Sequence, residues 1–73
     1  METKAKKIII KAANRIADLK ACIAMGGEVS TQNMWRGTVN GLLEAAGIIT
    51  GCTYTWDSDG VYENGSNEPI VRA

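Results

Sequence analysis

The chain contains no histidine and no phenylalanine, only one proline and only two cysteines. Histidine is the most frequent general acid or base in enzymes and a common zinc ligand, so its absence argues against both kinds of site. Cys22 and Cys52 are too few for a disulfide-rich secreted scaffold, and neither has a histidine to activate its thiol. We therefore expect no catalytic site, no cofactor and no metal.

Long apolar runs are also missing. Ile8, Ile9 and Ile10 are followed at once by Lys11, and no uncharged apolar run approaches the roughly 20 residues that span a bilayer. For the same reason the first residues do not resemble a secretory signal peptide. The sequence predicts no membrane segment and a cytoplasmic location.

The net charge is zero, with eight basic and eight acidic residues, but the two signs are segregated. Residues 1–20 hold six basic and two acidic residues, whereas residues 51–73 hold one basic and four acidic residues. The basic segment 1–20 can bind phosphates or an acidic surface, whereas the acidic segment 51–73 repels nucleic acid.

The length of 73 residues predicts one small domain, residues 1–73. A domain of this size buries only about 60% of the surface of its unfolded chain, and such domains are often stabilised by oligomerisation. We therefore expect a homo-oligomer.

Two segments have the apolar spacing of amphipathic helices. In residues 3–25 the apolar positions recur every three or four residues, and they are Ala5, Ile9, Ala12, Ile16, Leu19 and Ile23. Gly26 and Gly27 are expected to end this helix. The second helix is predicted over residues 31–46, with Ser30 or Thr31 as its cap and Gly47 at its end.

Gly37 and Gly41 lie four residues apart on one face of the second predicted helix. Each glycine costs roughly 1 kcal/mol relative to alanine in a helix interior, so a compensating contact is expected. Glycine lets another backbone approach closely, and the first helix offers the small residues Ala13 and Ala17. The sequence predicts a close helix–helix contact here, either within one subunit or between subunits.

The apolar spacing changes to two from Ile48 to Trp56, which is typical of a β-strand. Asp57-Ser58-Asp59-Gly60 has the composition of a hairpin turn. Residues 61–63 are expected to form the second strand of the hairpin. Ile70 and Val71 form a candidate third strand. Pro69 places this strand at the edge of the sheet or marks its start, because proline lacks a backbone N–H. The expected fold class is α+β: two helices followed by a C-terminal β-hairpin, with a short third strand as an option.

Three of the four aromatic residues, Tyr54, Trp56 and Tyr62, fall within nine residues around this turn. Aromatic side chains with a charged rim are typical of protein–protein contact surfaces, and the rim here is Asp57, Asp59 and Glu63. The leading hypothesis is therefore a non-catalytic protein–protein interaction module of inhibitor or adaptor type. Small proteins of phages and plasmids often have such roles.

A second hypothesis is a small DNA-binding regulator that uses the basic side chains. Its candidate phosphate contacts are Lys4, Lys7, Lys11, Arg15, Arg36 and Asn40. Thr38-Val39, Leu43 and the run from Glu44 to Ile49 resemble the end of a recognition helix and the start of a wing in winged helix-turn-helix proteins. The resemblance implies major-groove contacts from Gln32, Asn33, Arg36, Thr38 and Asn40.

A third hypothesis is an oligomer that holds a small anionic ligand, such as a nucleotide, between its subunits. Lysine or arginine side chains would neutralise the ligand, and the aromatic rings would stack on it. The sequence leaves all three hypotheses open.

Overall fold

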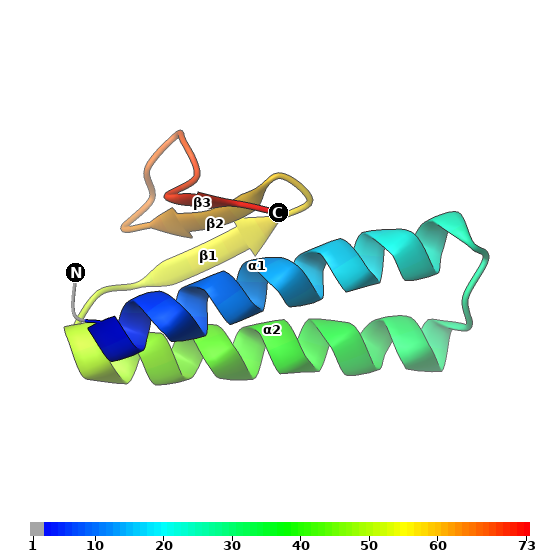
Figure 1. Ribbon diagram of the computed structural model, residues 1–73, viewed down its shortest axis with the longest axis horizontal. Coiled ribbons are helices and arrows are strands. Elements are labelled where there is room, and N and C mark those ends of the chain that lie inside the picture. The colour runs from blue at the N-terminus through cyan, green and yellow to red at the C-terminus, as the bar shows by residue number, and fades with distance from the viewer. Residues whose placement is uncertain (1–2) are drawn as a thin grey trace.

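Two long antiparallel helices lie side by side, and a small sheet rests on one side of the pair (Figure 1). The computed structural model describes residues 3–73. The elements in chain order are α1 (Thr3–Ala24), α2 (Val29–Thr50), β1 (Tyr54–Asp57), β2 (Gly60–Glu63) and β3 (Val71–Arg72). The strands form one antiparallel sheet in the order β1-β2-β3. The predicted α+β class, both helices, the hairpin and the third strand are confirmed.

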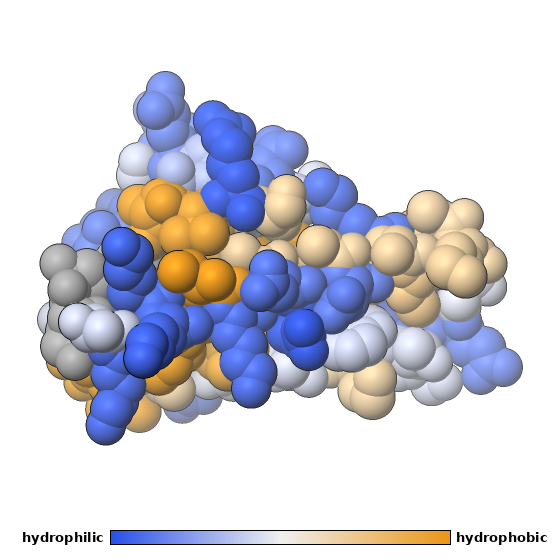
Figure 2. Space-filling model, viewed as in Figure 1, coloured by the Kyte–Doolittle hydropathy of each residue, from blue (hydrophilic) through white to orange (hydrophobic). Residues whose placement is uncertain are grey.

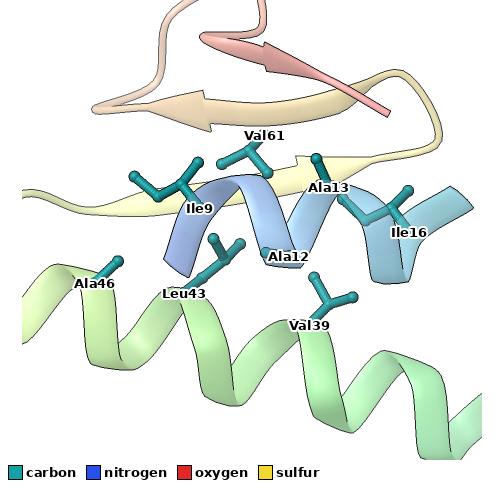
Figure 3. Packing of buried hydrophobic residues seen from close by; sticks show 8 residues of the cluster. All are labelled: Ile9, Ala12, Ala13, Ile16, Val39, Leu43, Ala46 and Val61. Carbon is teal, nitrogen blue, oxygen red and sulfur yellow. The ribbon is translucent and has the colours of Figure 1, made fainter. Parts of the chain in front are cut away.

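The core fills the space where α1, α2 and β2 meet. Figure 3 shows the apolar side chains of the two helices pointing toward one another, with Val61 of β2 closing the cluster from the sheet. The cluster consists of Ile9, Ala12, Ala13, Ile16, Val39, Leu43, Ala46 and Val61. This is the arrangement that the apolar spacing of α1 and α2 predicts, because each helix buries one stripe.

The sheet covers only part of the helical hairpin, and the end with the α1–α2 link extends beyond it (Figure 1). Ile23, expected in the buried stripe of α1, is 49% exposed because it lies near this end. Met25 in the link is 85% exposed, and Figure 2 shows tan atoms at this end beside pale and blue ones. Within residues 3–73, neither helix offers the apolar length that a bilayer crossing requires.

Helix α2 is longer than predicted at both ends. It does not end at Gly47 but continues to Thr50, and Gly51 caps it in the left-handed conformation, with φ 75° and its N–H donating to the Gly47 carbonyl at 2.8 Å. Ile48, predicted to begin a strand, lies on the helix and is 80% exposed. At the other end, neither Ser30 nor Thr31 is the cap, because the helix begins at Val29 after Glu28.

Side-chain oxygens shape both ends of the hairpin. At the turn, a carboxylate oxygen of Asp57 accepts a hydrogen bond from the Asp59 N–H at 2.8 Å. At the open end, the side chain of Asn64 accepts from the Thr53 N–H at 3.0 Å, while the Asn64 N–H donates to the Thr53 carbonyl at 2.8 Å. Asparagine suits this position because its φ of 51° is left-handed.

Candidate functional site

The strand register decides which hairpin side chains face the helices. Trp56 pairs with Val61, which is fully buried, so Trp56 and Tyr54 lie on the inner face of the sheet. Thr55 pairs with Tyr62, and both lie on the outer face. The expected aromatic cluster is therefore divided between two faces, with Tyr62 alone on the outer one.

Tyr54 and Trp56 anchor β1 on α2. Both pack against the core cluster. The Trp56 indole N–H donates to the side-chain oxygen of Asn40 at 2.7 Å, and the Tyr54 hydroxyl lies 3.0 Å from the Thr50 hydroxyl. The inner aromatic pair thus has a structural role, and only the exposed edge of Trp56 is left for a partner.

On the outer face, Tyr62 is bound to the carboxylate at the hairpin turn. Its hydroxyl donates to the two oxygens of Asp57 at 3.1 and 3.0 Å. Beside this pair lies a hollow of about 410 Å³, the sheet hollow, lined by Thr55, Trp56, Asp57, Tyr62, Gly65, Ser66 and Asn67. The sheet hollow therefore combines the Tyr62 ring with the Asp57 carboxylate and a polar loop.

Glu63 does not belong to this outer group. It pairs with Tyr54 on the inner face, at the end of β1 away from the turn. Asp59 stays exposed at the turn. Of the six residues predicted to bind a partner, Asp57 and Tyr62 thus lie fully on the outer face, with Asp59 at its edge.

The environment of Tyr62 favours its neutral form. Loss of water contact is the largest cause, followed by the hydrogen bond to Asp57 and the negative charges of Asp57 and Asp59, and together they raise the pKa of Tyr62 above its ordinary value of 10.0. Loss of water contact also raises the pKa of Tyr54. Both hydroxyls therefore remain hydrogen-bonding groups at neutral pH.

These two pKa shifts predict a loss of stability in alkali. Above pH 10 the tyrosines of the unfolded chain ionise while those of the folded chain still hold their protons, so the free energy of unfolding falls as pH rises from about 10 through the folded-state pKa values. Urea unfolding of the wild type and of a Tyr54→Phe/Tyr62→Phe variant between neutral and alkaline pH measures this. The variant should lose less stability than the wild type; an identical decline would contradict the assignment.

A second concave region, the helix–strand groove, lies between α2 and β1. It has a volume of about 390 Å³ and is lined by Asn40, Leu43, Glu44, Gly47, Ile48, Cys52, Thr53 and Tyr54. Its only charged side chain is Glu44 and its thiol is Cys52, which is half-buried and free. No base lies beside the thiol in this lining, so the groove is suited to contact rather than to nucleophilic chemistry.

The basic residues of the DNA-binding hypothesis do not gather on one surface. Lys4, Lys7 and Lys11 are exposed on α1, whereas Arg36 and Asn40 are on α2. Arg15 lies 3.1 Å from the carboxylate of Asp18, and its guanidinium carbon is 5.7 Å from the centre of the Trp35 ring. The three lysines thus form one exposed face of α1, apart from Arg36 and Asn40 on α2.

The resemblance to winged helix-turn-helix proteins finds no support in this fold. The helices of the described chain form a long antiparallel pair, with the sheet lying back on them (Figure 1). Gln32 and Asn40 are engaged within the chain, with Gly27 and Trp56 respectively. Thr38 lies on the opposite side of α2 from Asn33 and Asn40, so these residues do not form one reading face.

The predicted close contact at the glycine pair does not occur within the chain. A Cβ atom added to Gly37 or to Gly41 would meet nothing within 4 Å, and both residues are exposed. Ala13 is buried in the core instead, and Ala17 is exposed on α1. The prediction of a close helix–helix contact within one subunit is therefore wrong, and a contact between subunits stays a prediction.

Sequence reasoning missed the loop that completes the sheet hollow, Gly65, Ser66 and Asn67. The sequence did indicate that Thr55 faces outward, because it alternates along the strand with Tyr54 and Trp56, which face inward.

Among residues 3–73, no group of three or more histidine, cysteine or acidic side chains is placed to hold a metal ion. Comparison of the chain with protein-family models, curated proteins and solved structures finds no match.

Proposed function

We propose that this chain is a small non-catalytic protein-interaction module, of adaptor or inhibitor type, that binds a basic segment of its partner at the sheet hollow. The observation that carries the proposal is the placement of Tyr62 and the Asp57 carboxylate, joined by hydrogen bonds, at one hollow of about 410 Å³ on the outer face of the sheet. An aromatic ring beside a carboxylate suits an arginine or lysine side chain. The face of the Tyr62 ring attracts a cation, and the carboxylate accepts its hydrogen bonds.

The charges around the sheet hollow support a cationic rather than an anionic ligand. Asp57 and Asp59 stand at the turn, and Arg72 pairs with Gly60 across β2 and β3 on the same face. Arg72 offsets one of these negative charges and leaves the turn acidic. A phosphate group would be repelled here, which disfavours nucleic acid and nucleotide at this site.

Binding to a short synthetic peptide rich in arginine and lysine tests the proposal, with the same peptide carrying glutamine instead as the ligand control. Asp57→Asn and Tyr62→Ala should each weaken binding of the basic peptide about fivefold, because each removes an interaction of the order of 1 kcal/mol. Isothermal titration calorimetry measures the affinities. Circular dichroism checks that each variant is folded.

The matched control is a Lys4/Lys7/Lys11→Glu variant, which changes charge on α1 and leaves the hairpin intact. It should bind the basic peptide at least as tightly as the wild type. The DNA-binding hypothesis predicts instead that duplex DNA binds, that this variant alone loses binding, and that affinity falls steeply with salt. That outcome, or equal binding of the glutamine peptide, would contradict the proposal.

A further inference from the structure

β1 is an edge strand, and one of its two sides has no neighbouring strand. The sheet order is β1-β2-β3, so β2 pairs with β1 on the other side only (Figure 1). The Thr53 carbonyl accepts from the Asn64 N–H at 2.8 Å, and in an antiparallel ladder every second residue bonds to the same neighbour. Thr55 therefore also bonds toward β2, whereas the N–H and C=O groups of Tyr54 and Trp56 point to the free edge.

The backbone groups at this free edge are not used elsewhere in the chain. Among residues 3–73, no hydrogen bond joins the backbone of Tyr54 or Trp56 to a group outside the sheet. Edge strands are often protected by a proline or a bulge, but β1 contains no proline and pairs with β2 in an uninterrupted register. A second extended backbone can therefore complete the ladder along β1.

The space beside the free edge is open down to α2. β1 packs mainly on α2, whereas β2 and β3 pack on α1, so the free edge overlooks the side of α2 remote from α1. The helix–strand groove lies there, with Leu43, Gly47 and Ile48 of α2 opposite Tyr54. Neighbouring strands lie about 4.8 Å apart, so an added strand would stand over this groove. Its inward side chains would cover Ile48, which is 80% exposed.

The charges around β1 favour a basic segment over a second copy of this chain. Asp57 stands on the outer face beside the sheet hollow, and Glu44 lines the helix–strand groove on the inner side. The strand Tyr54–Asp57 contains no basic residue, so a second copy of β1 would bring no positive charge to these carboxylates. A segment with lysine or arginine side chains complements them.

We propose that the basic segment of the partner binds in an extended conformation, as a fourth strand antiparallel to β1. The inference rests on the proposed function and adds the conformation and the side-chain pattern of the segment. Antiparallel pairing is the more stable of the two directions, and successive side chains of a strand point to opposite faces. Basic side chains on the outer face would reach Asp57 and Tyr62, while the apolar side chains between them would pack on Ile48. The segment recognised is thus one in which basic and apolar residues alternate.

A synthetic peptide that alternates arginine and valine tests the proposal by calorimetry, with two N-methylated forms. Residues directly opposite each other in an antiparallel pair have side chains on the same face, so the valines direct their N–H groups at Tyr54 and Trp56. N-methylation of the valines should weaken binding at least about tenfold, because it removes these hydrogen bonds. N-methylation of the arginines, whose N–H groups point away from β1, should change the affinity less than about twofold. Equal effects of the two modifications would overturn the proposal.

Backbone amide exchange locates the added strand on the protein. Saturating peptide should slow exchange of the Tyr54 and Trp56 amides at least about tenfold, because their N–H groups become bonded. The Thr55 amide, already bonded to β2, should slow by a smaller factor. Protection of Tyr54 and Trp56 in the free chain that grows with protein concentration would place a second copy on this edge and overturn the proposal.

Ile48→Gln tests the packing of the apolar side chains. It should weaken binding of the alternating peptide about fivefold, because it removes apolar contact in the helix–strand groove. Met25→Gln is the matched control, since Met25 is exposed in the α1–α2 link, and its affinity should equal that of the wild type. Unchanged affinity in Ile48→Gln would overturn the placement of these side chains.

Asp57→Asn separates this inference from the proposed function. Weaker binding in Asp57→Asn together with equal binding of the two N-methylated peptides would keep the basic-segment site and overturn the added strand. Equal binding of the alternating peptide to the wild type and to Asp57→Asn would overturn both.

Discussion

Ile16→Ala is expected to lower the free energy of unfolding by about 3 kcal/mol, within the range for isoleucine-to-alanine changes in cores. Ile16 is fully buried where α1 packs against α2, and its neighbours belong to different elements that cannot all close the cavity. A domain of this length has a total stability of roughly 4–11 kcal/mol. One substitution should therefore remove a large fraction of it, which urea unfolding measures.

Ile23→Ala on the same helix is the matched control for this prediction. Ile23 is 49% exposed at the end of the helical hairpin that the sheet does not cover, so its loss should cost less than about 1 kcal/mol. Equal losses for the two variants would show that the core does not lie where α1, α2 and β2 meet.

Gly60→Ala is expected to destabilise the sheet strongly, by about 3 kcal/mol. Gly60 has a φ of 150°, which other residues rarely adopt, and it lies against β3. An added Cβ would collide with the Val71 carbonyl oxygen and lie 2.9 Å from the Cα of Arg72. Both neighbours are backbone atoms of a paired strand, so the strand itself would have to move.

Gly65→Ala separates the steric effect from the cost of a left-handed backbone. Gly65 has a φ of 76°, but an added Cβ there would meet nothing within 4 Å. Its replacement should therefore cost only about 1 kcal/mol. Thermal unfolding of both variants decides the matter, and a Gly65→Ala loss as large as that of Gly60→Ala would contradict the close approach of β3.

The helices could be predicted from the sequence because each buries one stripe at helical spacing, but the end of α2 could not. Gly47 has the position of a helix terminator, yet the helix continues through it. The structure gives this glycine another reason: an added Cβ would lie 2.9 Å from the Cys52 carbonyl oxygen. Glycine there allows the chain to return closely after the helix, a contact that local patterns do not encode.

The alternation of the hairpin placed Tyr54 and Trp56 on one face but could not say which face meets the helices. That choice depends on long-range partners, such as the bond from the Trp56 indole to Asn40, sixteen residues away. Nor could the sequence distinguish an internal contact at Gly41 from one between copies. Only the relative position of α1, α2 and the sheet shows that Gly41 faces outward.

Nuclear magnetic resonance titration of the wild-type chain with the basic peptide decides whether the outer face of the sheet binds a cationic segment of a protein, because the location of the shifts is itself the result. We expect backbone amide shifts to gather at Thr55, Asp57, Tyr62 and Ser66, and the amides of Lys4, Lys7 and Lys11 to stay unchanged. Shifts confined to the α1 lysines on addition of duplex DNA, with none at the sheet hollow on addition of the peptide, would contradict it.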